Sequence, residues 1–203
     1  PSVFDHRLQP RLVLPLLALL IAFPLIAQAT GEDFYIGVAS RVLVFGLAAA
    51  SLNFILGFGG MVSFGHAAFV GLGAYTVGLL MQQGVSSAWL AWPLAMLMGA
   101  AFSLLVGAIS LRTQGVYFIM ITLAFAQMLY YLIMSFKSLG GDDGLSLPSR
   151  SDIGLGLDLG QDATFYYVVL ALVSTSLLLM ARVLNERFGH VLQAIKENET
   201  RMQ

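Results

Sequence analysis

The sequence contains no cysteine and few charged residues, and these two shortages already narrow its class. Without cysteine there is no disulfide, no thiolate metal ligand and no cysteine nucleophile. Only 10% of the residues are charged, 58% are hydrophobic and the mean hydropathy is +0.84, far from the composition of a soluble domain. A net charge of -1 predicts no nucleic-acid partner. We therefore predict an integral membrane protein that has the lipid bilayer as a partner.

Acidic side chains are also missing from the apolar runs of the sequence. Proton- or sodium-coupled carriers usually need an ionisable group inside the membrane, so this absence favours energy supplied from elsewhere. No Gly-Lys-Ser/Thr follows the glycines, and the three histidines, His6, His66 and His190, are scattered. We therefore predict no catalytic residue, no metal site and no cofactor in this chain, which is not expected to be an enzyme.

Six apolar runs have about the length needed to cross a bilayer. The fold class expected is all-α, a polytopic helical membrane protein with about six transmembrane helices. The third run is short, as expected if it follows a broken segment. The runs cover residues 12–29, 34–56, 67–81, 89–109, 116–136 and 164–184.

Lysine and arginine residues predict the orientation, because cytoplasmic loops carry the excess of these cations. An N-terminus in the cytoplasm leaves only Lys137 and Arg150 outside. It also places the C-terminal segment inside. The cations on the cytoplasmic side are then Arg7, Arg11, Arg112, Arg182, Arg187, Lys196 and Arg201.

The most informative segment runs from Leu52 to Phe69, where glycines, polar side chains and a histidine interrupt apolar sequence. Non-helical backbone at membrane depth is tolerated only where it is buried in protein or lines a polar cavity. We therefore predict a transport protein with a broken or re-entrant segment between its second and third helices. The candidate translocation path combines residues of this break with polar residues of the fifth helix: Asn53, Gly59, Gly60, Ser63, His66, Thr122, Gln127 and Tyr130.

A structural role competes with the path role at each of these positions. His66 has no second histidine or carboxylate near it in sequence, which favours structural hydrogen bonding over proton relay or metal ligation. Interhelical hydrogen bonds explain the polar residues of the fifth helix as well as pore lining does. In the third run, small residues recur on one stripe, Ala67, Gly71, Ala74 and Gly78, and predict close packing of another helix.

The segment after the last apolar run reads as a short amphipathic helix. Phe188, Val191, Leu192 and Ile195 share one face. The helix could lie at the lipid interface or fit a groove on a cytoplasmic partner, and its near balance of lysine and glutamate favours the partner. We therefore divide the chain into a transmembrane permease domain, residues 1–184, and a cytoplasmic coupling segment, residues 185–203.

Four ordered blocks of this sequence resemble the inner-membrane permeases of branched-chain amino acid ABC transporters, of the LivM-like kind. The first block is Leu52 to Tyr75, with Gly-Phe-Gly-Gly-Met-Val-Ser-Phe-Gly-His at its centre. The second, from Arg112, is Arg-Thr-Gln-Gly-Val-Tyr-Phe-Ile-Met-Ile-Thr-Leu-Ala-Phe-Ala-Gln, and the third is the Gly-Gly-Asp-Asp-Gly-Leu at 140–145. The fourth, Arg187 to Glu199, resembles the segment that such permeases present to their ATPase.

The resemblance implies a permease subunit of an importer for branched-chain, hydrophobic amino acids in a bacterial inner membrane. It implies ATP hydrolysis on separate cytoplasmic ATPase subunits, a periplasmic solute-binding protein and a homologous second permease subunit. In the family the coupling loop continues into further spans, so we expect this chain to be a fragment. By the same resemblance the ATPase-coupling residues are Arg187, Phe188, Gly189, Leu192, Ala194, Ile195, Lys196 and Glu197.

Two other functions remain open on the sequence alone. A urea or short-chain amide permease of the same superfamily would share every motif quoted above. A passive channel is disfavoured by the coupling-like tail, and dependence of transport on ATP would distinguish an ABC importer from a channel.

Overall fold

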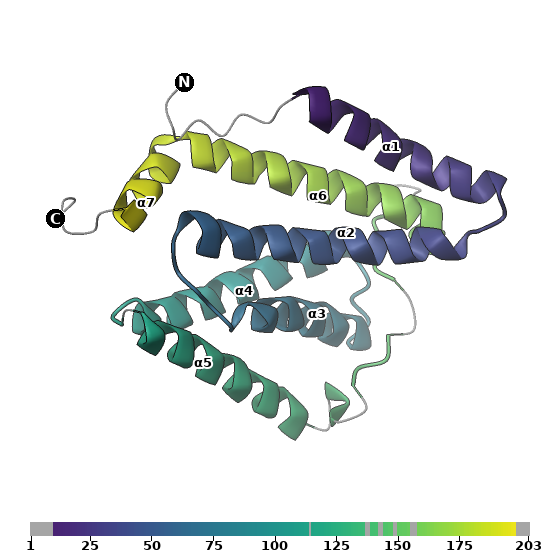
Figure 1. Cartoon of the computed structure of the whole chain (residues 1–203). Coiled ribbons are helices and arrows are strands. Elements are labelled where there is room, and N and C mark those ends of the chain that lie inside the picture. Colours follow the sequence, from purple (N-terminus) through teal and green to yellow (C-terminus); the bar gives the residue numbers. More distant parts are fainter. Residues whose placement is uncertain are drawn as a thin grey trace. The chain divides into compact units, whose positions relative to one another are not determined.

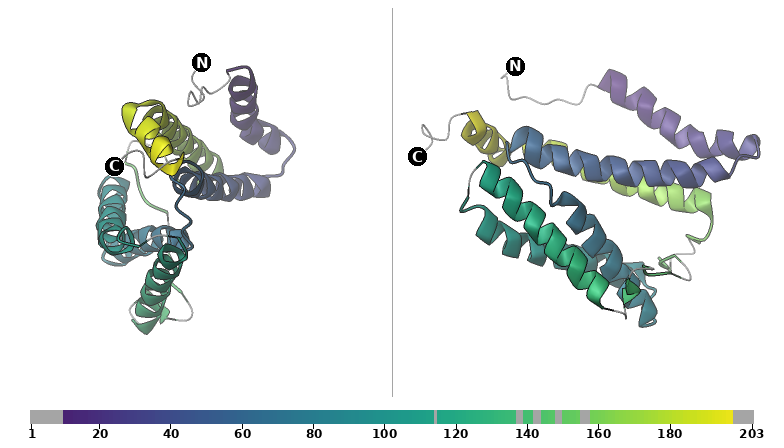
Figure 2. Two further views of the ribbon diagram at one scale, coloured as in Figure 1. Left: turned by 60° about the vertical axis from the view of Figure 1, so that its left-hand side comes forward. Right: turned by 60° about the horizontal axis from the view of Figure 1, so that its bottom comes forward.

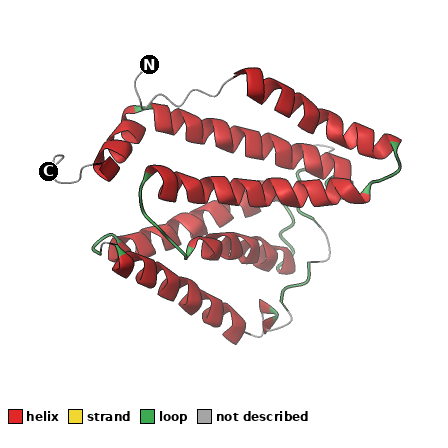
Figure 3. Cartoon of the chain, viewed as in Figure 1, coloured by secondary structure: helices red, strands yellow, loops and turns green. Residues whose placement is uncertain are grey.

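The computed structural model describes residues 10–113, 115–136, 139–141, 144–147, 150–154 and 158–197, and within these ranges the chain is helical apart from its turns and connections (Figures 1 and 3). The five-residue element η1 is a π-helix that continues α2 without a gap. The elements in chain order are α1 (Pro10–Ala29), α2 (Phe34–Asn53), η1 (Phe54–Phe58), α3 (His66–Gln82), α4 (Ala88–Ser110), α5 (Val116–Ser135), α6 (Asp162–Asn185) and α7 (Arg187–Glu197).

The all-α fold class is confirmed, and each predicted apolar run lies in a helix whose ends differ from the prediction by only a few residues. Four helical stretches of the described chain are long and apolar enough to cross a membrane: Phe34–Phe58, Ala88–Ser110, Val116–Ser135 and Asp162–Asn185. The apolar part of α1, Val13–Ala29, and the 17-residue α3 are shorter. Proteins of this composition are multi-pass membrane proteins.

The chain forms two compact units. Unit 1 is discontinuous and comprises residues 1–60 and 160–203, whereas unit 2 comprises residues 61–159. Unit 1 therefore holds α1, α2, η1, α6 and α7, and unit 2 holds α3, α4 and α5.

In unit 1, α2 packs along α6 in the same direction, and α1 contacts both helices (Figure 1). The core consists of Ala27, Ile36, Tyr166 and Leu170, and the Tyr166 side chain is 0% exposed. Its ring lies 6.1 Å from the ring of Phe23, and its hydroxyl donates a hydrogen bond of 2.9 Å to the backbone carbonyl of Leu20.

That hydrogen bond compensates for a proline inside α1. In an α-helix the Leu20 carbonyl would accept from the N–H of residue 24, but this residue is Pro24, which has no N–H. An unpaired carbonyl within an apolar surrounding is costly. The Tyr166 hydroxyl supplies the missing donor and ties α6 to the kink-prone part of α1.

In unit 2, α3 packs mainly against α4, and α5 contacts both (Figure 2). The N-terminal end of α4 is capped from far along the chain. The Ala88 N–H donates to the Asp152 carbonyl, and the Asp152 N–H donates to the Ser86 carbonyl, both at 2.7 Å. Two backbone hydrogen bonds thus hold residue 152, beyond α5, beside the start of α4.

Candidate functional site

The break predicted between the second and third helices is present. A π-type hydrogen bond of 3.3 Å joins the Gly59 N–H to the Phe54 carbonyl and ends the helix. Residues 59–65 are not helical, and Gly60 has a φ of +69°, which side chains with a Cβ rarely adopt. Helix resumes at His66, so the break is shorter than the Leu52 to Phe69 segment that suggested it.

The π-helical turn places the side-chain amide of Asn53 against the backbone of Gly57. A Cβ at Gly57 would lie 2.6 Å from Oδ1 of Asn53, one turn earlier, so the Asn53 side chain rests against the bare backbone there. Single π-helical turns require one extra residue in an α-helix and are frequent at functional sites. The turn is therefore a distinctive feature of the end of α2.

The candidate path residues are divided between the units, each of which is described by itself. Asn53, Gly59 and Gly60 belong to unit 1. The unit 2 members are Ser63, His66, Thr122, Gln127 and Tyr130. None of the comparisons below tests their roles, which stay predictions.

In unit 2 the start of α3 touches the first half of α5. Gly65 and Thr122 are both buried, and a Cβ at Gly65 would lie 2.5 Å from the Thr122 carbonyl oxygen. The Thr122 hydroxyl donates to the Ile119 carbonyl of its own helix at 3.0 Å. Thr122 therefore acts here as a close-packing residue whose hydroxyl is already satisfied.

Beyond this contact, toward the C-terminal ends of α3 and α5, a groove of ≈ 350 Å³ lies between the two helices. That volume is within the range of small-molecule sites. Gln127 and Tyr130 line it, as does Tyr75 from α3, a residue that the sequence analysis did not select. The other lining residues are apolar or glycine: Phe64, Ala67, Ala68, Gly71, Leu123, Ala126, Leu129, Ile133 and Met134. The groove is thus a mainly apolar, uncharged surface with three polar side chains.

Thr122, Ser63 and His66 lie outside this lining. Thr122 and Tyr130 are eight residues apart on α5, which places their side chains about 80° apart around the helix axis. This explains why Tyr130 lines the groove and Thr122 does not. The His66 ring lies 6.0 Å from that of Phe69, which stacks edge-on against Phe102 at 5.5 Å. Among the described residues no cluster of His, Asp and Glu could hold a metal ion.

The small residues of α3 serve two surfaces. Ala67 and Gly71 line the groove, whereas Gly78 is buried against Leu145 and Leu147 of the segment after α5. A Cβ at Gly78 would collide with the Leu145 side chain. Of these small residues only Gly78 is closely packed within the described chain, and its neighbour is a connecting segment. Gly71 has nothing within 4 Å of a Cβ, and Ala67 and Ala74 are exposed, so the predicted packing of another helix along this stripe is wrong.

The predicted amphipathic helix after the last span is present as α7. A Cβ at Gly189 would collide with the backbone of Leu184, so glycine allows α7 to fold tightly back against the end of α6. The Phe188 side chain is 63% exposed, Val191 is exposed, and Leu192 and Ala194 are half-buried. The side chains of Ile195, Lys196 and Glu197 lie outside the described part of the chain, although their backbone is helical.

Within unit 1, α7 contacts the π-helical turn η1, and both views of Figure 2 place it beside that end of α2. The amphipathic helix and the turn that ends α2 are therefore direct neighbours. The sequence, in which they are about 130 residues apart, gave no indication of this contact.

Residues 34–203 match the model of a family described as the permease component of the branched-chain amino acid transport system. The chain belongs to this family. It is 27% identical to the high-affinity branched-chain amino acid transport system permease protein LivM of Escherichia coli K12. The same protein of Salmonella typhimurium LT2 is 28% identical. Each alignment covers 98% of this chain and 52% of the relative, so the chain spans about half the length of the curated relatives it matches. No solved structure matches it.

Membership confirms the resemblance to LivM-like permeases and the expectation of a transport permease component instead of an enzyme. It also agrees with the multi-pass helical fold. The division into a permease domain and a coupling segment is not tested by the match, which runs across both.

Proposed function

We propose that this protein is a permease subunit of an ABC importer for branched-chain amino acids, driven by ATP hydrolysis on separate cytoplasmic subunits. A periplasmic solute-binding protein delivers the amino acid, and a homologous second permease completes the pathway. The observation that supports coupling most directly is the contact of α7 with η1, because the helix proposed to meet the ATPase touches the turn that opens the break.

The mechanism follows from this neighbourhood. Closure of the ATPase moves α7, whose exposed Phe188 and Val191 offer an apolar face to a groove on the partner. Movement of α7 is passed to η1 and to the glycine-rich break, which alternates between packings that admit solute from either side. The coupling residues Arg187, Lys196 and Glu197 complete the contact, whereas Gly189 is buried against Leu184 and sets the angle of α7.

The membrane is the bacterial inner membrane, with the N-terminus and α7 in the cytoplasm. The parallel course of α2 and α6 places η1 and α7 at the same end of unit 1. The excess of lysine and arginine on the side that carries α7 supports the cytoplasmic orientation.

The solute passes the groove between α3 and α5. Its apolar wall suits an aliphatic side chain, and Gln127, Tyr75 and Tyr130 offer hydrogen bonds to the amino acid's polar end without a fixed charge. Thr122, Ser63 and His66 hold the start of α3 in place, while Asn53, Gly59 and Gly60 form the hinge of the break.

Uptake into vesicles tests the proposal. The full-length permease is reconstituted with its transporter subunits, and labelled leucine is supplied with ATP. We expect uptake that valine competes for and urea does not. Urea entry without leucine uptake would transfer the protein to the amide branch, and uptake without ATP would contradict the ABC assignment.

The coupling step has its own test. Phe188→Asp with Val191→Asp removes the apolar surface that α7 exposes and should abolish ATP-dependent uptake while the protein still inserts in the membrane. Unchanged uptake in this variant would refute the role of α7.

A further inference from the structure

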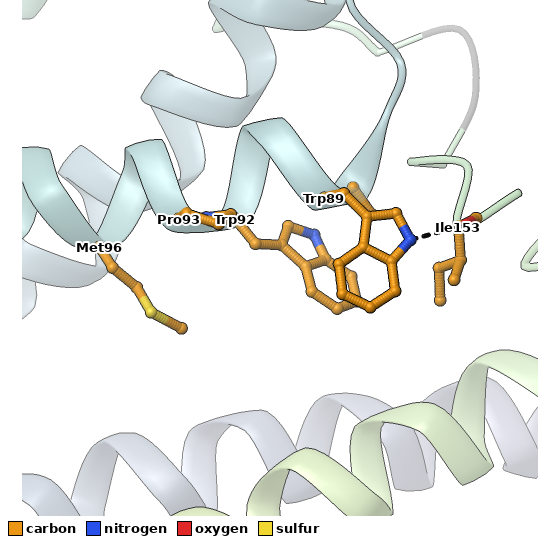
Figure 4. Close-up of a pocket in the computed structure, with 6 residues that line it drawn as sticks. Trp89, Trp92, Pro93, Met96 and Ile153 are labelled. Carbon is orange, nitrogen blue, oxygen red and sulfur yellow. Dashed lines mark hydrogen bonds between the residues drawn. The ribbon is translucent and has the colours of Figure 1, made fainter.

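The start of α4 carries an apolar groove that takes no part in the proposed transport. Ala88, Trp89, Trp92, Pro93, Met96 and Ile153 enclose a cavity of ≈ 180 Å³ (Figure 4). Trp89, Trp92 and Met96 follow one another at helical spacing, and their side chains lie along the same side of α4. Trp89 is 67% exposed and Met96 is 71% exposed.

The polar atom of Trp89 is already bonded within the chain. Its indole Nε1–H donates to the Ile153 carbonyl at 2.9 Å, as drawn in Figure 4. The ring therefore needs no further hydrogen-bond partner and offers its apolar surface to the groove.

A sharp boundary between polar and apolar surface crosses this end of α4. On one side lie the exposed residues Ser86, Ser87 and Asp152, and the Asp152 N–H donates a hydrogen bond to the Ser86 carbonyl. The Asp152 carboxylate accepts a hydrogen bond of 2.8 Å from the Gly154 N–H. On the other side, along the next turns of a helix long enough to cross a membrane, exposed large side chains are apolar: Leu90, Leu94, Met96, Leu97 and Met98. The change occurs across the tryptophan pair.

We propose that a phospholipid binds here, with the upper part of one acyl chain in the groove between Trp89, Trp92 and Met96. The boundary fits a bilayer surface, because tryptophan concentrates where headgroups meet hydrocarbon. A soluble partner would leave the apolar turns beyond Trp92 uncovered, whereas lipid covers them continuously. The segment around Asp152 then lies at the level of the headgroups.

Tryptophan fluorescence can report on this groove, because both tryptophans of the given sequence line it. The full-length protein is reconstituted in phosphatidylcholine vesicles whose acyl chains carry bromine near the headgroup, at mid-chain or near the methyl end. The signal is the fluorescence that a Trp89→Phe/Trp92→Phe variant lacks. We expect shallow bromines to quench roughly half or more of it, and deep bromines to quench much less.

A depth control uses the same helix. Leu97→Trp in the Trp89→Phe/Trp92→Phe background places an indole about 12 Å along α4 from Trp89 and about 7.5 Å from Trp92, and its strongest quenching should shift to deeper bromines. Equal fluorescence in brominated and plain vesicles would mean that protein covers the groove and would overturn the proposal. Strongest quenching of the native pair by the deepest bromines would overturn it as well. Both outcomes are measured on the native tryptophan pair, with the Trp89→Phe/Trp92→Phe variant as background, and neither depends on transport.

Discussion

At the scale of single residues, the side chains that matter most replace something that the backbone lacks. Tyr166 supplies a donor that Pro24 removed, and Gly65 and Gly189 supply space where two backbones meet. None of these roles can be inferred from the local sequence, because each depends on a partner in another element. The sequence predicted Gln127 and Tyr130 as polar members of α5, but the groove that they line with Tyr75 exists only through the packing of α3.

The contribution of the Tyr166 hydroxyl to stability can be measured, with the hydroxyl of Tyr167 as the control. Tyr166→Phe should lower the free energy of unfolding of the purified protein by about 0.5–1.5 kcal/mol, because the Leu20 carbonyl loses the donor that replaces the missing N–H of Pro24. Tyr167→Phe should cost less, since the Ile21 carbonyl accepts at 3.1 Å from an exposed hydroxyl and keeps its helical donor at residue 25. Equal losses in thermal unfolding would contradict the role assigned to Pro24.

The groove can be narrowed by one side chain. Ala126→Leu adds bulk to the groove wall, so ATP-dependent uptake of leucine should fall more than that of alanine or a similarly small substrate. Ala124→Leu is the matched control, because Ala124 is exposed on the same helix and does not line the groove. If the two variants have the same uptake profile, the groove does not carry the solute.

At the scale of elements, helix positions followed from apolar run length, but two joints did not. The π-helical turn needs one residue more than an α-helix, and the stretch Phe54–Phe58 contains no sequence signal for that addition. The angle between α6 and α7 depends on Gly189 meeting the Leu184 backbone, a contact that hydrophobic periodicity cannot report. Periodicity identifies which face of a helix is apolar, not which element covers it.

We expect alanine at position 189 to have the opposite effect on stability from alanine at an open helical glycine. Replacing an open helical glycine with alanine usually stabilises by about 0.5–1 kcal/mol. Gly189→Ala should instead destabilise by about 1–3 kcal/mol and reduce coupled uptake, because the new methyl collides with the end of α6. Gly46→Ala, in α2 of the same unit with nothing within 4 Å, should be neutral or stabilising. Thermal unfolding of both variants compares them directly, and a stabilised Gly189→Ala protein would disprove the tight junction.

At the scale of the whole molecule, the absence of cysteine makes the proposed orientation simple to test. Gln83→Cys and Leu111→Cys place single thiols at exposed positions on opposite ends of α4. In intact cells a membrane-impermeant maleimide should label Gln83→Cys, and it should label Leu111→Cys only after permeabilisation. The reverse pattern would invert the orientation and place α7 outside the cell.

Because unit 1 is built from two separate stretches of sequence, its two parts are synthesised at different times. The Trp89–Ile153 bond joins residues 64 apart, whereas the Tyr166–Leu20 bond joins residues 146 apart. At about 5–20 residues per second the ribosome needs roughly 7–30 s to pass from Leu20 to Tyr166. All of unit 2 is translated within that interval. The Leu20 carbonyl therefore lacks this donor in the nascent membrane protein until α6 has been synthesised, and we expect the chain to depend most on an insertase or chaperone during that interval.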